Sequence, residues 1–214
     1  MALADLRGTM GNQVMVGTRG GLALRRKAQY RYVPVGRAAD QAARFKSVSA
    51  LWSELSYDAV QAWRAYADTV LLTDRISGSR YSPTAFNAFV GLATKFVQVN
   101  PGEPVPLLPP VGEFLGDSVQ VSTSVVGSAV RFSATGANAD GVVTELMLQP
   151  LANVRRKPNS GAYKAMAFVA FASGSLSADV GVEPGVYACA YRFVEAATGR
   201  MGLLMPLDGI VVVE

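Results

Sequence analysis

Histidine is absent from the 214-residue chain, and cysteine occurs once, as Cys189. The chain therefore lacks the commonest general base and metal ligand, and a single thiol cannot form an intramolecular disulfide. The Gly-Lys-Ser/Thr and Gly-x-Gly-x-x-Gly sequences that hold nucleotides are missing too. We expect a protein that is not an enzyme and that has no catalytic residues, no metal and no cofactor.

Long hydrophobic runs are missing as well. The longest purely apolar stretch, residues 165–172, is far shorter than the ~20 residues of a membrane-crossing helix. The first residues, MALADLRGTMG, lack the apolar segment that follows the basic start of a secretory signal. Half of all residues are hydrophobic (50%), which allows a buried core. We expect assembly in a reducing cytoplasm without a membrane anchor.

Positive charge is concentrated at the start of the chain. Residues 1–39 hold seven Arg and Lys residues against Asp5 alone, a formal +6, whereas residues 40–110 sum to zero and residues 111–214 to −2. Such a segment attracts a negative partner, which could be nucleic acid, an acidic groove or a neighbouring subunit. A solvated arm without a partner is the alternative.

The basic segment also carries a strand pattern. Apolar residues alternate with others in residues 13–16 and 22–26, on either side of the glycine-rich GTRGG sequence at 17–21. This pattern predicts two short strands around a turn. We interpret residues 1–39 as a basic arm or hairpin that becomes ordered on a partner. The residues that we predict to bind the partner are Arg19, Arg25, Arg26, Lys27, Tyr30, Arg31, Tyr32 and Arg37.

Residues 40–100 predict a small helical unit. Two helices, the first over about 38–52 and the second after an N-cap at Ser56, each show apolar residues at spacings of three, four and three. A third helix is predicted from Ser82 to Asn100, after a polar loop at 73–82. The stripes predicted to face the core are Phe45, Val48, Trp52 and Leu55 on the first helix, and Val60, Trp63, Ala67 and Val70 on the second.

The rest of the chain predicts a linker and a β domain. Residues 101–110 contain five prolines, which predicts an extended, semi-rigid spacer. Strands are then predicted near residues 118–123, 129–134, 142–149, 163–171, 175–180, 186–194 and 209–213. Seven short strands in about 100 residues are typical of an immunoglobulin-like or fibronectin-III-like sandwich. Between the third and fourth strands, the basic triplet at 155–157 is interpreted as a solvated turn.

One short sequence supports the sandwich. Residues 183–189, EPGVYAC, resemble the acid-x-Gly-x-Tyr-x-Cys run of the immunoglobulin family, in which the tyrosine forms a corner. The chain lacks that family's second cysteine and its strand C tryptophan, so the resemblance implies the sandwich without antibody-type recognition. We predict an α+β protein: a basic arm plus a small helical unit, followed by a C-terminal all-β immunoglobulin/fibronectin-III-like sandwich in residues 111–214.

The whole layout resembles an uncharacterised family of proteins encoded in bacterial genomes and prophages. The resemblance rests on GTRGG at 17–21, QAARF at 41–45, Trp52 with Leu55, Asn100 and the C-terminal β domain. It implies a non-enzymatic structural component of a bacteriophage virion, such as a capsid decoration, neck or tail accessory protein. Other virion subunits (capsid, portal or tail proteins) would be its partners, it would be a homo-oligomer within the assembly, and it would be assembled in the host cytoplasm.

The main alternative is a nucleic-acid-binding protein that uses the basic N-terminal arm. Its Arg and Lys residues would neutralise phosphates, and Tyr30 and Tyr32 would stack on bases. A dedicated DNA-binding protein usually extends its basic face into the folded domain, whereas residues 111–214 sum to −2. A cell-surface adhesion module is a third hypothesis, which the missing secretory signal disfavours.

Overall fold

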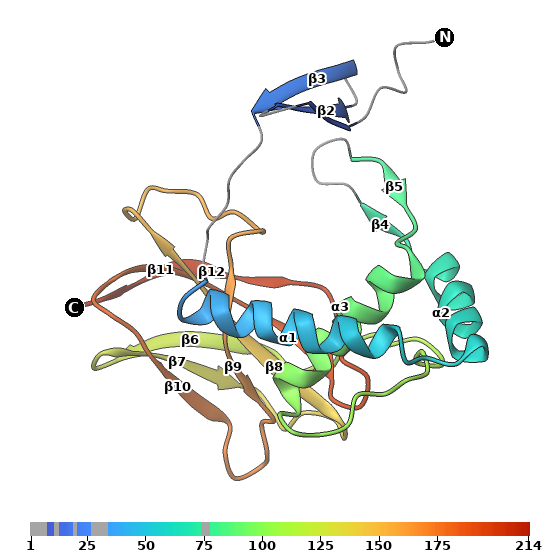
Figure 1. The fold of residues 1–214 in the computed structure, drawn as a ribbon. Coiled ribbons are helices and arrows are strands. Elements are labelled where there is room, and N and C mark those ends of the chain that lie inside the picture. The colour runs from blue at the N-terminus through green and yellow to red at the C-terminus, as the bar shows by residue number, and fades with distance from the viewer. Residues whose placement is uncertain (1–7, 11–12, 19–20, 27–33, 74–77) are drawn as a thin grey trace. The chain divides into compact units, whose positions relative to one another are not determined.

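The computed structural model describes residues 8–10, 13–18, 21–26, 34–73 and 78–214. The chain divides into two compact units, residues 1–42 and 43–214, which we describe separately. Together the described residues form three helices and several antiparallel sheets (Figure 1). The predicted α+β class is thus confirmed.

The first unit contains a three-stranded antiparallel sheet. Its strands are β1 (Gly8–Met10), β2 (Gln13–Thr18) and β3 (Gly21–Arg26), in the order β1-β2-β3. Thr18 pairs with Gly21, so β2 and β3 are the two strands predicted around the glycine-rich sequence. β1 was not predicted.

Three helices follow: α1 (Arg37–Trp52), α2 (Tyr57–Thr69) and α3 (Ala85–Val99). Ser56 caps α2 as predicted, because its hydroxyl accepts a hydrogen bond from the Ala59 amide at 3.2 Å. α3 begins two residues later than predicted, with Thr84 as its N-cap, and ends at Asn100. The short paired strands β4 (Leu72–Thr73) and β5 (Arg80–Tyr81) lie at the two ends of the predicted polar loop.

The helices share a core centred on Phe89. Its ring centroid lies 5.6 Å from that of Trp52 and 5.3 Å from that of Trp63, so the two tryptophans meet at one phenylalanine. Trp63 is 2% exposed, as expected for a core residue. Phe45 is 52% exposed, and its predicted inward position is wrong, because α1 packs on this core only from Val48 onward.

The β part contains two antiparallel sheets. The first has the order β10-β7-β6 and the second β12-β11-β8-β9. Phe132 of the first sheet and Leu146 and Leu148 of the second belong to one buried core. The strands are β6 (Val121–Val126), β7 (Ala129–Ala134), β8 (Val142–Leu151), β9 (Lys164–Val169), β10 (Ser177–Gly181), β11 (Gly185–Glu195) and β12 (Met205–Val213).

Two residues of the EPGVYAC sequence have clear local roles. The hydroxyl of Tyr187 donates a hydrogen bond to the carbonyl oxygen of Glu183 at 2.7 Å, which ties the start of β11 to the preceding turn. Cys189 is 1% exposed in the core, and burial raises the pKa of its thiol to about 11. The cysteine is therefore a buried small side chain.

The helices and sheets pack together within residues 43–214. The indole nitrogen of Trp63 donates to the carbonyl oxygen of Leu107 at 2.8 Å, and the side-chain nitrogen of Asn100 donates to that of Ala196 at 2.6 Å. The proline-rich segment is therefore not the spacer that its composition predicts. It packs on the helices within one compact unit.

Candidate partner-binding surfaces

The described part of the arm presents cations on its last strand. Arg25 and Arg26 end β3 and are both exposed. Successive side chains of a strand point to opposite faces, so the sheet carries positive charge on each side. Arg37 begins α1 and is exposed. The other predicted partner-binding residues lie outside the described residues: Arg19, Lys27, Tyr30, Arg31 and Tyr32.

An apolar groove of about 260 Å³ lies between α2, the β4–β5 hairpin and α3. Gly91, in the middle of α3, lines it, and a Cβ atom at Gly91 would meet nothing within 4 Å. The missing side chain thus leaves the backbone of α3 accessible from the groove. The sequence signal for this groove was a glycine within an apolar helix. The other lining residues are Tyr66, Val70, Leu72, Tyr81, Pro83, Asn87, Ala88, Leu92 and Met201.

Exposed large hydrophobic residues lie on two neighbouring segments, one of which follows Met201 of the groove. Met201 lines the groove, and Leu203, two residues later, is 85% exposed. The segment around Gly112 lies beside this one, since Arg200 donates to the carbonyl oxygen of Gly112 at 2.6 Å. Exposed apolar patches of this kind mark binding surfaces. We call the following residues the apolar strip: Leu107, Leu108, Val111, Leu115 and Leu203.

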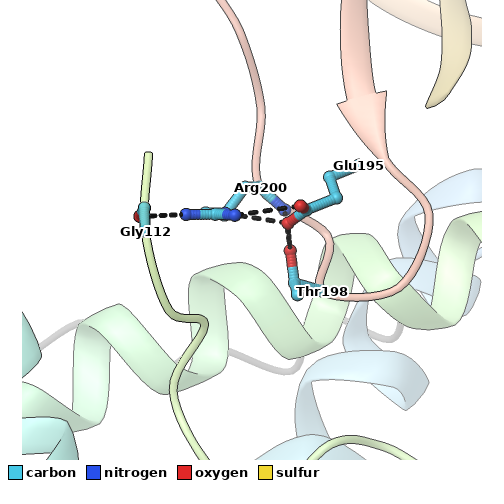
Figure 2. A network of polar contacts seen from close by, with 4 residues as sticks. All are labelled: Gly112, Glu195, Thr198 and Arg200. Carbon is cyan, nitrogen blue, oxygen red and sulfur yellow. Dashed lines mark hydrogen bonds and ion pairs between the residues drawn. The ribbon is translucent and has the colours of Figure 1, made fainter. Parts of the chain in front are cut away.

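A polar network fixes the two segments of the strip (Figure 2). The guanidinium of Arg200 makes two hydrogen bonds to the Glu195 carboxylate, at 2.8 and 2.9 Å, and Thr198 donates to the same carboxylate. The hydrogen bonds from Arg200 hold the pKa of Glu195 below its usual value. These groups satisfy one another, so the network positions the loop between β11 and β12.

A second polar cluster is buried where α3 meets β8. Glu145 accepts hydrogen bonds from Lys95 at 2.8 Å and from Arg192 at 2.5 Å. Its side chain is 0% exposed and that of Lys95 9%. Burial lowers the pKa of Lys95 against the attraction of Glu145. We interpret this cluster as a structural tie between helix and sheet.

Comparison with known proteins finds no family model, curated protein or solved structure that matches the chain. Among the described residues, no group of three or more Asp, Glu or Cys side chains could hold a metal ion. In the same part of the chain, no helix combines the length and apolar character of a membrane span. A proposal of function therefore rests on the surfaces described above.

Proposed function

We propose that this protein is a non-enzymatic structural component of a bacteriophage virion, a capsid decoration, neck or tail accessory protein. The observation that carries the proposal is the separate N-terminal unit. Residues 1–42 hold seven bases against Asp5 and Asp40, a net +5, while residues 43–214 hold 13 bases and 14 acids, a net −1. A small basic unit joined to a larger, nearly neutral one suits anchoring to an acidic neighbouring subunit.

The groove and the apolar strip support a second contact through the helices. Their residues are exposed or half-buried in the single chain, and a subunit of an assembly covers such surfaces with its neighbours. Capsid, portal or tail proteins are the partners that we propose, with further copies of this chain in the same assembly. The proposed location is the virion, after assembly in the host cytoplasm.

For the β part we propose an immunoglobulin/fibronectin-III-like sandwich that the assembly displays. With β6 to β12 lettered A, B, C, C′, E, F and G, the sheet orders read E-B-A and G-F-C-C′. Immunoglobulin-type sandwiches divide their strands in this way. The bond from Tyr187 to the backbone of Glu183 lies at the position of the tyrosine corner, which further supports the proposal.

Deleting residues 1–39 is expected to abolish incorporation into particles, because the arm provides the charged anchor. The rest of the chain keeps its own buried cores and should remain folded. The measurement is immunodetection in purified particles, with the full chain and the deletion variant expressed at equal levels. Equal incorporation of both chains would contradict the proposal. Tight DNA binding near physiological salt, about 0.15 M, that disappears with the arm would favour a nucleic-acid-binding protein instead.

Filling the groove is expected to weaken incorporation without unfolding the protein. Gly91→Phe adds a ring at a position that lines the groove, where an added Cβ meets no atom within 4 Å outside the adjoining helix backbone. Gly91→Ala is the control. It should raise the free energy of unfolding by about 0.5–1 kcal/mol, because alanine favours helix more than glycine does, and it should leave incorporation unchanged. Gly136→Phe adds the same ring at another open glycine, and an equal loss there would remove the groove from the proposal.

A further inference from the structure

The loop between β8 and β9, residues 152–163, presents three consecutive cations on an ordered backbone. The amide of Asn159 donates to the side-chain oxygen of Gln149 at 2.9 Å, and the amide of Arg155 donates to that of Asn153 at 3.0 Å. Pro158 further restricts the backbone. Arg155, Arg156 and Lys157 are all exposed. We call residues 155–160 the basic loop.

The bases of residues 111–214, all of which the structure describes, fall into two groups. Three of the seven are paired with carboxylates: Arg131 with Asp179, Arg192 with Glu145 and Arg200 with Glu195. The other four have no ion pair in this part of the chain, and all lie within ten residues of one another: Arg155, Arg156, Lys157 and Lys164.

Acids are also missing from the sequence on either side of these four bases. Between Glu145 and Asp179 the sequence contains no Asp or Glu. Residues 111–214, whose net charge is −2, thus hold their unpaired cations at one end of one sheet. Such separation leaves a positive local potential, which attracts a polyanion.

The lining of the basic loop favours phosphate groups. Residues 155–160 line an open hollow of about 680 Å³, and apart from Pro158 every lining side chain is polar or charged. Guanidinium groups bind phosphate through two parallel hydrogen bonds. A protein interface would need an apolar or aromatic centre, whereas interfaces with nucleic acid are polar and strongly positive. Val154, 55% exposed, is the large apolar side chain next to the hollow.

We propose that the basic loop binds the phosphate backbone of nucleic acid without reading its sequence. The cations of Arg155, Arg156 and Lys157 each neutralise a phosphate, and the ordered loop keeps them on one surface. These residues belong to the unit of residues 43–214 and not to the N-terminal arm. It goes beyond the structural role proposed above and does not depend on what the arm binds.

The test compares the salt dependence of binding in the full chain. Each phosphate contact contributes about −0.9 to the slope of log affinity against log salt for duplex DNA. The triple variant Arg155→Ala/Arg156→Ala/Lys157→Ala should therefore show a slope that is shallower by about 2 to 3 units. Fluorescence anisotropy with a labelled short duplex, titrated at several salt concentrations, measures this difference. Both chains keep the arm, so the arm's contribution to the slope cancels in the difference between them.

A matched control removes the same charge elsewhere. Lys46, Arg64 and Arg80 are exposed on α1, α2 and β5, and their triple alanine variant should keep the slope of the full chain. An equal loss of slope in both triple variants, or no loss in the loop variant, would overturn the proposal. Restored binding in an Arg155→Lys/Arg156→Lys chain would support simple charge neutralisation.

Two further outcomes distinguish a nucleic-acid site from a site for an acidic protein and from the virion contacts. A labelled acidic peptide is bound at the loop and then challenged with polyglutamate or with DNA. If polyglutamate displaces the peptide and DNA does not, the partner is an acidic protein and the proposal is wrong. Incorporation of the loop variant into particles should match that of the full chain. Failure of the nucleic-acid site therefore leaves the proposed virion role standing, and loss of the virion role leaves the salt titration unchanged.

Discussion

Replacing Glu145 by glutamine is expected to lower the free energy of unfolding by about 3–5 kcal/mol. Glu145 is 0% exposed and is the carboxylate that Lys95 and Arg192 share. Glutamine keeps the size of the side chain but leaves two cations without a counter-charge at a buried helix–sheet contact. The positive charge of Arg44 already acts on Lys95, so the variant concentrates like charges further. Denaturant unfolding of both chains measures the loss.

An exposed ion pair supplies the control. Arg131 and Asp179 make two short hydrogen bonds of 2.6 Å, comparable to those in the buried cluster, but their side chains are 38% and 43% exposed. Asp179→Asn should cost less than about 1 kcal/mol, because water screens the pair and solvates the remaining cation. Equal losses in the two variants would show that the position of Glu145 in the interior does not determine its contribution.

The pH dependence of stability provides a second measurement on the natural chain and Glu145→Gln. Burial alone would raise the pKa of Glu145, but the hydrogen bond from Arg192 and the charge of Lys95 outweigh it, and the pKa lies below its usual value. A carboxyl group of this kind stabilises the fold above its unfolded pKa of about 4.3 and loses that contribution as the pH falls through the folded pKa. The difference in stability between the natural chain and Glu145→Gln should therefore shrink in acid.

Local signals in the sequence predicted most of the elements. Ser56 and Asn100 mark helix ends by short-range hydrogen bonds, which a sequence pattern captures. The first strand of the β part is predicted three residues early, at 118–123 instead of Val121–Val126. Val119 and Val121 are both buried, so the apolar alternation begins before the strand pairs with β7. The buried apolar residues begin two residues before the strand starts to pair with β7. The sequence pattern shows where burial begins but not where pairing begins.

Contacts between distant segments could not be predicted in the same way. Lys95 and Glu145 are 50 residues apart in the chain, and each is a single charge in an apolar stretch. Such a charge needs a partner, but the sequence does not say which one. Packing of the helices on the sheet therefore stayed hidden, and residues 101–110 were predicted as a spacer from their prolines alone.

For the candidate surfaces, too, local features could be predicted from the sequence and contacts between distant residues could not. The hairpin around GTRGG follows from glycine and strand alternation within six residues on either side, and β2 and β3 confirm it. The Arg155–Lys157 triplet is plain in the sequence, where it was interpreted as a solvated turn. The triplet differs from Arg131, Arg192 and Arg200, each of which forms an ion pair with a carboxylate. Only the structure shows this difference.

Replacing Gly199 by alanine is expected to lower the free energy of unfolding by about 2–4 kcal/mol. Gly199 has a φ of +75°, and a Cβ atom there would lie 2.3 Å from the carbonyl oxygen of Leu92 and 2.7 Å from the amide nitrogen of Phe96. Both atoms belong to the backbone of α3, which cannot yield as a flexible side chain does. The loop between β11 and β12 must therefore move away from α3, or α3 from the sheet. Thermal and denaturant unfolding measure the loss.

A control at Gly141 separates the cost of the left-handed backbone from the cost of the contact with α3. Its φ is +72°, nearly that of Gly199, but nothing lies within 4 Å of an added Cβ. Gly141→Ala should therefore show only the cost of a left-handed backbone, about 1–2 kcal/mol. A larger loss at Gly199 measures how closely the loop packs on the helix, and equal losses would mean that the contact is easily displaced. Because Leu92 and Met201 both line the groove, Gly199→Ala should also weaken incorporation more than Gly141→Ala does.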